Sequence, residues 1–377
     1  MANGNPAVAN NQMRGMLLAT APRMRKNLST FSLNGLGQTT RMKLFNVGVL
    51  TKLYARVIVP ITIGTATATA SAKAPYNYLT RIRLTDYDGT DRINISGFQL
   101  FVITCVRNRM PFGWNNAGPI FTAGGSTELS GIVTNPQVPT AVGSSTIDYY
   151  IEIPVAYEAE TDLRGAILSQ TGVGELYLSV DVNSLLVQNG NDDAVYNGAA
   201  TTTVVLNGTA TMQVWQEYLM PQTVGNGMVP LPQFDLMTVY ELNGMVRSSD
   251  NLANGQEKLV NYPNVRSVIG AYLSFVNNSL VSNGMSGLRL IVNGNNIMKE
   301  WNNNDKLIEQ RNYNFGDVAR GTYWETHRSK PIETALFGNV QLGFTPSVAI
   351  TGTSYLEIAF ENFYTKGAQL PGLAQST

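Results

Sequence analysis

Cysteine and histidine are almost absent from this sequence. Its 377 residues include a single cysteine, Cys105, and a single histidine, His327. A disulfide within the chain and a metal site built from several histidines are therefore excluded. A lone thiol in the apolar run of residues 98–106 is typical of a small buried hydrophobic side chain. A Ser-His-Asp triad would have to use His327, and no nucleophile-elbow motif accompanies it.

Charge is also scarce. Charged residues make up 14% of the chain, against about a quarter in ordinary soluble proteins. Asn, Thr, Ser, Gln and Gly take their place, which predicts a weakly charged surface suited to packing against other copies. The 26 basic and 26 acidic residues cancel, yet eleven basic residues precede the first acidic one, Asp86. We expect this basic end to contact nucleic acid, lipid headgroups or the acidic body of a neighbouring copy.

Long apolar runs are missing as well. No stretch approaches the roughly 20 residues that a membrane-spanning helix needs, and residues 16–19 are too few for a signal-peptide core. Phosphate-loop and dinucleotide fingerprints are also lacking. We therefore expect a soluble protein that folds in a reducing cytoplasm and uses no cofactor.

Strand patterns dominate what is present. Apolar and polar residues alternate, as in half-buried strands, in residues 147–155, 173–182 and 355–363. In the last of these, the pattern places Leu356, Ile358 and Phe360 on a core and leaves Glu357 and Glu361 in solvent. Continuous apolar runs predict strands near sheet centres at residues 53–63, 98–106 and 265–276. Helices are expected at residues 10–26, 161–168 and 304–310.

Proline and glycine cluster at residues 220–232, which we interpret as a linker. On each side, short strands separated by turn residues fit the eight strands of a jelly roll. The predicted fold class is therefore all-β, with two tandem eight-stranded jelly rolls (a double jelly roll) and an N-terminal helical arm. A similar aromatic and acidic strand ends each half, at residues 214–218 and 360–364. The predicted segments are an arm at 1–46, a first jelly roll at 47–219, the linker at 220–232, a second jelly roll at 233–365 and a tail at 366–377.

Two acidic clusters are candidates for a metal site or a catalytic site. Asp86, Asp88 and Asp91 surround Gly89, but the glycine is misplaced for a calcium loop, and a turn between strands fits better. Residues 158–162 carry three carboxylates, and a glycosidase needs two of them facing one another across a cleft. Here they precede the expected helix at 161–168, where negative charge complements the helix dipole. We therefore expect no catalytic residue and no metal site.

Four stretches, in the same order and spacing, resemble the major coat protein of tectiviruses, which are tailless bacteriophages with double-stranded DNA inside an internal membrane. They are PVAYEAETDLRGAIL at 154–168, QEYL at 216–219 followed by DLMTVY at 235–240, NYNF at 312–315, and KPIET at 330–334 with GNV at 338–340.

The resemblance implies a major capsid protein and not an enzyme. It implies two fused jelly rolls, a homotrimer of pseudo-hexagonal outline, contacts with neighbouring trimers and with penton or minor capsid proteins, and an icosahedral shell. It also implies an N-terminal helix near the internal membrane. The virion capsid would be its location after folding in the host cytoplasm, without sequence-specific binding of nucleic acid. On this basis Arg14, Arg23, Arg25 and Lys26 are the candidate contacts to the membrane or to a neighbouring subunit.

Two other functions compete with this interpretation. A receptor- or carbohydrate-binding jelly-roll spike protein would concentrate aromatic and polar residues in one exposed site, and Trp114 with Phe112 is the nearest candidate. A glycosidase built on Glu158, Glu160 and Asp162 is the third possibility.

Overall fold

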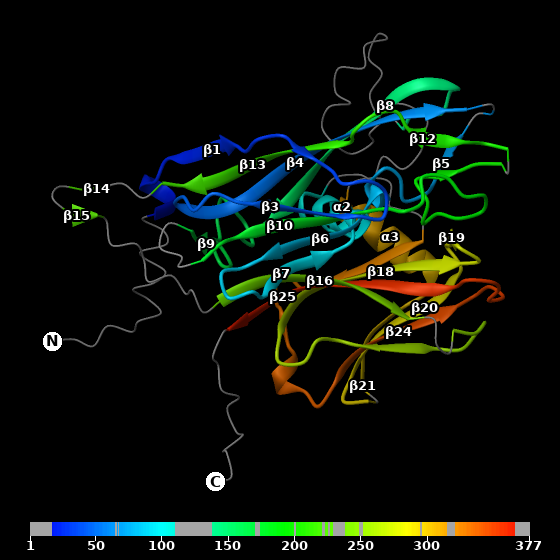
Figure 1. Ribbon diagram of the computed structural model, residues 1–377. Coiled ribbons are helices and arrows are strands. Elements are labelled where there is room, and N and C mark those ends of the chain that lie inside the picture. Colours follow the sequence, from blue (N-terminus) through cyan, green and yellow to red (C-terminus); the bar gives the residue numbers. More distant parts are fainter. Residues whose placement is uncertain are drawn as a thin grey trace, which may run out of the picture.

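The structure is a computed structural model. It describes residues 17–64, 66, 68–109, 138–169, 174–199, 201–220, 223–224, 227–228, 238–248, 252–294, 296–314 and 321–365. Strands form two stacked halves, the first drawn in blue to green and the second in yellow to red (Figure 1). The helices are α2 (Gly97–Arg107) and α3 (Asn303–Asn314), with short 3-10 helices η1 (Tyr76–Tyr78) and η2 (Thr334–Leu336).

The first half contains two sheets that face each other. One has the order β1-β13-β4, with β8 on the other side of β4, and the second has the order β3-β10-β6-β7. The strands of this half are β1 (Arg23–Asn27), β2 (Phe31–Ser32), β3 (Thr39–Lys43), β4 (Val49–Ile63), β5 (Thr69–Ala70), β6 (Leu79–Thr85), β7 (Asp91–Ile95), β8 (Gly143–Pro154), β9 (Ile167–Leu168), β10 (Tyr177–Val182), β11 (Tyr196–Asn197), β12 (Val204–Leu206) and β13 (Thr211–Leu219).

The second half repeats this arrangement. One sheet has the order β16-β25-β18-β22 and the other the order β17-β24-β20-β21. Its strands are β16 (Thr238–Ser248), β17 (Lys258–Asn261), β18 (Ser267–Asn277), β19 (Leu280–Val281), β20 (Met285–Val292), β21 (Asn296–Trp301), β22 (Thr322–Thr326), β23 (Ile332–Glu333), β24 (Val340–Pro346) and β25 (Tyr355–Thr365). A hairpin of β14 (Thr223–Val224) and β15 (Gly227–Met228) lies between the halves in sequence, inside the predicted linker.

Corresponding strands occupy corresponding places in the two halves. Taken in chain order, β1, β3, β4, β6, β7, β8, β10 and β13 match β16, β17, β18, β20, β21, β22, β24 and β25 in sheet position. The helices match too, because α2 connects β7 to β8 and α3 connects β21 to β22. Two facing four-stranded sheets with this order make a jelly roll, so the predicted fold class of two tandem jelly rolls is confirmed. The two similar strands that end the halves, β13 and β25, are equivalent.

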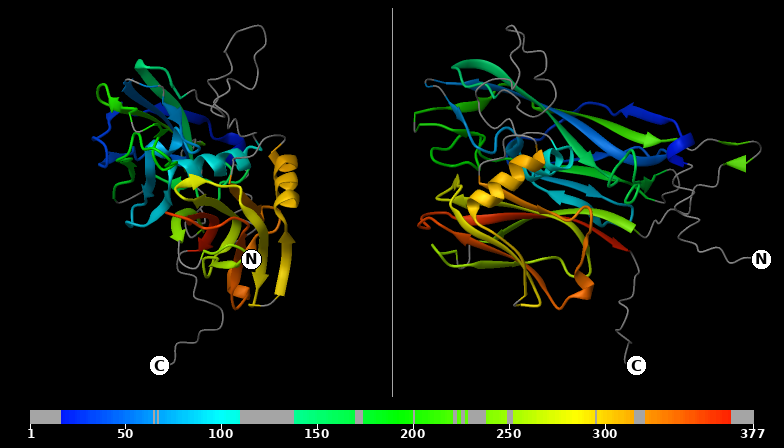
Figure 2. Two further views of the ribbon diagram at one scale, coloured as in Figure 1. Left: turned by 90° about the vertical axis from the view of Figure 1, so that its right-hand side faces the viewer. Right: turned by 180° about the vertical axis from the view of Figure 1, so that it is seen from behind.

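One sheet runs through both halves. The edge strand β7 of the first half pairs in parallel with β16 of the second, through Leu242 opposite Ile93 and Asn243 opposite Asn94. This pairing produces a ten-stranded sheet, against which the β17-β24-β20-β21 sheet packs. Each half keeps its own hydrophobic core, one built around β4, β8 and α2 and the other around β18, β20 and β24. The two views in Figure 2 show α3 at the flank of the second half, on the same side as β21.

One helix prediction is correct only in part and another is wrong. Of the expected helix at 10–26, residues 10–16 lie outside the described residues and residues 17–20 are helical. The helix stops before Pro22, and Arg23–Asn27 form strand β1, which pairs with β13. Part of the predicted arm, β1 to β3, therefore belongs to the sheets of the first half. Residues 161–168 form a turn and the short strand β9, and in this turn the amide nitrogen of Asp162 donates to the carbonyl oxygen of Glu158 (2.9 Å). The predicted helix at 304–310 is confirmed by α3.

One strand prediction is also wrong. The apolar run at 98–106 lies in helix α2, where every residue from Gly97 to Val106 is buried. A helix can be apolar all round when protein surrounds it, and periodicity then cannot separate it from a buried strand. Ser96 caps its first turn, accepting a hydrogen bond from the amide of Gln99 at 3.2 Å. The runs at 53–63 and 265–276 are confirmed as parts of β4 and β18.

Candidate functional site

The most unusual polar groups of the described residues lie between the two halves, on the face of β25 that turns away from the second core. Glu357 and Glu361, predicted to be in solvent, are 2% and 0% exposed. The prediction that these two carboxylates face solvent is wrong, because the first half covers this face and β25 is buried on both sides. Buried carboxylates need partners that restore what water would supply, and here the partners come from both halves.

Lys73 is the centre of the first cluster. Its Nζ lies 3.1 Å from Oε2 of Glu357 and 2.8 Å from Oδ1 of Asp193, and it donates to the hydroxyl of Tyr355 at 3.1 Å. Ser96, the cap of α2, donates to the other carboxylate oxygen of Glu357 at 3.0 Å. Burial alone would lower the pKa of Lys73, but the negative charges of Glu357 and Asp193 outweigh it and raise this pKa. Lys73 therefore remains charged, and it links the first half to β25.

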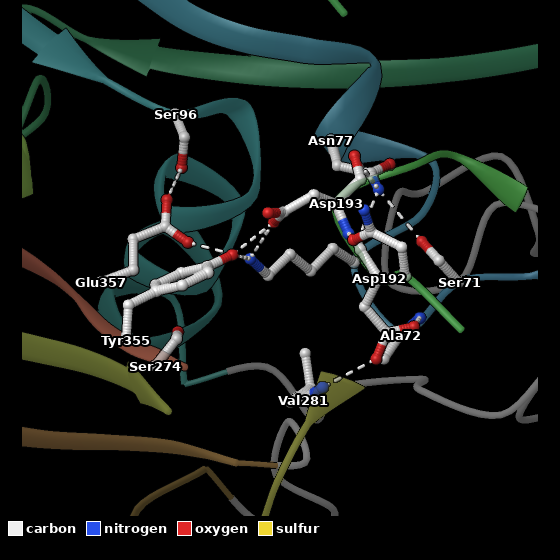
Figure 3. A network of polar contacts seen from close by, with 12 residues as sticks. Ser71, Ala72, Asn77, Ser96, Asp192, Asp193, Ser274, Val281, Tyr355 and Glu357 are labelled. Carbon is white, nitrogen blue, oxygen red and sulfur yellow. Dashed lines mark hydrogen bonds and ion pairs between the residues drawn. The ribbon is translucent and has the colours of Figure 1, made fainter. Parts of the chain in front are cut away.

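A loop of the first half extends this network. The carboxylate of Asp192 accepts hydrogen bonds from the amide of Ala72 (3.0 Å) and from that of Val281 in the second half (2.8 Å). Asn77 holds the loop, donating to the carbonyl oxygens of Asp192 (3.1 Å) and Ala194 (2.7 Å). Figure 3 shows the labelled side chains of Ser96 and Glu357 on one side of the network and Asp192 and Asn77 on the other. The loop is thus tied to both halves.

Glu361 is the centre of a second cluster. Tyr240 and Tyr272 donate to its two oxygens at 2.9 and 2.7 Å, and Arg107, the last residue of α2, lies 3.2 Å away. Arg328 approaches both oxygens at 3.3 Å. Burial alone would raise the pKa of Glu361, but Arg328 and Arg107 hold it below its ordinary value. This carboxylate is charged and joins α2 to three segments of the second half.

A third cluster lies within the second half and includes the single histidine. Glu325, which is 2% exposed, pairs with Lys306 of α3 at 2.9 Å and with Lys299 of β21. His327 is also buried, and its Nε2 lies 3.4 Å from the hydroxyl of Tyr262. Burial is the main cause that lowers the pKa of His327 to about 4. The histidine is neutral at pH 7, and its imidazole is packed among side chains.

The four predicted contact residues have different positions. Arg14 lies outside the described residues. Arg23 donates to the carbonyl oxygen of Ala159 at 2.9 Å and lies 3.4 Å from Glu160, while Arg25 lies 3.3 Å from Glu217. Lys26 stands 3.9 Å above the ring of Phe45. Three of the four therefore lie along β1 and contact side chains of their own chain, while remaining exposed.

The acidic clusters do not converge on a shared cleft. Glu158 accepts a hydrogen bond from Thr161, and Asp162 pairs with Arg164 at 2.6 Å. Asp86 is buried and pairs with Arg92 at 2.6 Å, beside the predicted turn at Gly89. Among the described residues, no group of three or more His, Cys, Asp or Glu side chains is placed to hold a metal ion. The aromatic candidate at 112–116 lies outside the described residues.

The residues that join the two halves were not predicted from the sequence. One feature could have indicated Lys73, because it is the sole charged residue between Arg56 and Arg81. Glu357 and Glu361 carried none, since alternation looks the same whether the polar face meets water or a second domain. None of the described helices is long and apolar enough to span a membrane.

Comparison with known proteins adds to this geometry. The model of a family described as P3 major capsid protein, N-terminal, matches residues 17–221. The major capsid protein P3 of Enterobacteria phage PRD1 is 24% identical over 332 residues, which cover 85% of this chain and 82% of that protein.

Solved structures show the same fold. The crystal structure of the major capsid protein of Sulfolobus Turreted Icosahedral Virus matches with a TM-score of 0.65 at 14% identity, over 92% of this chain and 97% of that one. VP54 of PBCV-1 matches with a TM-score of 0.58 at 12% identity, over 91% and 94%. The major capsid protein P2 of bacteriophage PM2 matches with a TM-score of 0.51 at 9% identity, over 92% and 100%.

Proposed function

The chain belongs to the family of P3 major capsid proteins, and from this premise we propose that it builds its shell as a pseudo-hexagonal homotrimer. It is a capsid protein and a structural part of the virion, since its relatives are capsid proteins and neither spike proteins nor enzymes. The observation that supports the trimer is the internal repeat. Two equivalent jelly rolls in each chain make six in three chains, enough to form a ring of hexagonal outline.

The buried clusters between the halves support this proposal. A capsid tile needs a fixed angle between its jelly rolls, because errors in that angle add up around a ring. Lys73, Glu357, Glu361 and Arg107 connect the halves at 0% to 9% side-chain exposure. Buried charges that lose their partners are costly, so any other arrangement of the halves is disfavoured. The two halves therefore act as one rigid unit in assembly.

Further parts of the proposal concern boundaries and partners. The first jelly roll begins at β1, and the segment before it, with Arg14, contacts the internal membrane of the particle. The trimers pack with neighbouring trimers and with penton or minor capsid proteins into an icosahedral shell around the membrane and double-stranded DNA. No sequence-specific contact to nucleic acid is needed, and the chain folds in the host cytoplasm before assembly.

Multi-angle light scattering on native protein tests the trimer. The expected mass is about three times the chain mass of 41.0 kDa. A stable monomer at micromolar concentration would contradict the proposal.

A further inference from the structure

The contact between the two halves has two components. The first is an edge contact, in which β7 lies parallel to β16. The second is a helix contact, in which α2 covers the outer face of the β16-β25-β18 sheet. Its two ends reach that sheet through Ser96, bound to Glu357, and Arg107, bound to Glu361. In its first turn, Gln99 packs so closely that a Cβ at Gly244 would lie 2.7 Å from its Oε1.

The internal repeat supplies an equivalent for each component. In the second half, β21 and α3 correspond to β7 and α2. In the first half, β1, β13 and β4 correspond to β16, β25 and β18. Within one chain these equivalents remain unused: β21 and β1 are edge strands, each paired on one side among the described residues. We call β21 and α3 the donor surface. The matching acceptor surface is formed by β1 and by the outer face of β13 and β4.

Both surfaces expose large apolar side chains, several on β21 and α3 and one on β1. On β21, Ile297 is 50% and Met298 56% exposed, and on α3, Ile308 is 59% exposed. On β1, all five residues are exposed, including Met24 at 45%. Exposed apolar side chains that gather on one element indicate an interaction site.

The acceptor face beside β1 has the same character. Tyr54, Tyr150 and Trp215 are half-exposed and stand on the outer face of the β1-β13-β4-β8 sheet. Tyr and Trp are the residues that interfaces favour, because they bury large areas at little cost in conformational entropy. The charges also complement one another. β1 carries three cations and no acidic residue, while α3 exposes two acidic residues, Asp305 and Glu309, and one cation, Arg311.

We propose that β21 and α3 of one copy dock on β1 and on the outer face of the β1-β13-β4-β8 sheet of the next copy, repeating the contact that joins the halves within one chain. The inference rests on the proposed trimer and names its surface. A contact of this kind is heterologous, and such contacts close into a ring when the rotation between units allows it. Under this arrangement β21 runs parallel to β1, as β7 does to β16.

The repeat also predicts which edge stays free in the trimer. β3 is the opposite edge of the β3-β10-β6-β7 sheet, and no described strand of the other half pairs with it. Its equivalent, β17, should therefore stay free. Leu259 of β17 is 44% exposed, close to the value for Met298, and provides a matched control in the same four-stranded sheet.

Photo-cross-linking of the full chain tests the surface. The probe p-benzoylphenylalanine is placed at Met298 in one protein and at Leu259 in another, and purified trimers are irradiated at low concentration. Denaturing gels are expected to show covalent dimers from the first site, with cross-linked peptides from β1, β13 or β4, and chiefly monomer from the second.

The outcomes separate the two proposals. If trimers form but Met298 captures no second chain, or captures peptides from elsewhere, the surface is wrong while the trimer stands. Equal capture from Leu259 would also overturn the surface. A monomer in light scattering would overturn the trimer and this surface together.

Discussion

At the residue scale, strand β25 is buried on both faces, one in the core of the second half and the other against the first half. Leu356, Ile358 and Phe360 lie in the core as expected. Glu361 is buried as well, because the opposite face of β25 meets α2. Replacing a buried ion cluster by apolar groups often leaves stability unchanged. We therefore expect the cluster around Glu361 to fix one arrangement of the two halves more than it raises the free energy of unfolding.

His327 gives a prediction about pH. Its pKa in the folded chain is about 4, against about 6.5 for an unfolded histidine. The unfolded state therefore binds more protons between these values, so stability is fully present above about pH 6.5 and is lost as pH falls to about 4. The gap corresponds to about 3 kcal/mol for each chain. Denaturant unfolding at about pH 7 and about pH 4.5 should show most of this loss in the native chain.

The matched variant is His327→Gln, which keeps hydrogen-bonding groups but cannot titrate. Its loss of stability over the same pH range should be smaller by roughly the amount attributed to His327. Carboxylates such as Glu361 remain in both proteins and cancel in the difference. Identical pH profiles for the two proteins would show that His327 is not held neutral by burial.

At the element scale, the alternating patterns were interpreted correctly as strands, whereas the continuous apolar runs were ambiguous. Two of these runs lie in the strands β4 and β18, and the third is helix α2. β8 shows the expected alternation, and in β10 Leu178, Val180 and Val182 are buried while Tyr177 and Asp181 are partly exposed. Helix α2 has no exposed face before Arg107, so its residues carried no period to read. The expected helix at 10–26 ends earlier than predicted for another reason. Pro22 ends it, and the basic residues beyond were free to pair with β13 as a strand.

Ser96 is the N-cap residue of α2. Its hydroxyl oxygen caps the helix by accepting a hydrogen bond from the amide of Gln99, and the same hydroxyl donates a hydrogen bond to Glu357. Ser96→Ala removes both bonds and should lower the free energy of unfolding by about 1 to 2 kcal/mol. Thermal or denaturant unfolding at fixed protein concentration measures this, because the stability of an oligomer depends on concentration.

Ser286→Ala is the control for this change. Ser286 is exposed, and its hydroxyl donates to the carbonyl oxygen of Thr345 at 3.2 Å. Its loss should stay within about 0.5 kcal/mol. Equal effects of the two substitutions would mean that the cap of α2 contributes nothing special.

At the scale of the whole molecule, the two-domain plan and the jelly-roll class were predictable, because turn residues and alternation repeat along the chain. The start of the first jelly roll was not. β1 reads as a basic segment of an arm, and only pairing with β13, far away in sequence, makes it a strand. The way in which β7 and β16 join the halves was likewise hidden, since strand pairing between domains leaves no local pattern.

The position of β1 changes how the proposed membrane contact must be tested. Removing residues 1–27 would delete an edge strand, and with it the surface inferred for the next copy. Leu17 is buried in a small cluster with Val49 and Leu163, so truncation should stop before it. Deletion of residues 1–16 takes away Arg14 and leaves β1 in place. A second variant replaces Arg23, Arg25 and Lys26 by glutamine and keeps the full length.

The truncated chain should form trimers like the native one but lose its salt-sensitive binding to anionic vesicles, measured by co-sedimentation. The reason is that Arg23 and Arg25 contact carboxylates of their own chain and lie on the surface inferred for the next copy, which leaves Arg14 for the lipid. A basic residue near an anionic surface contributes about 1 kcal/mol before salt screening. The glutamine variant should instead weaken the trimer while vesicle binding persists. Vesicle binding that survives truncation but disappears in the glutamine variant would place β1 against the membrane, and would contradict both the proposed lipid segment and the subunit contact.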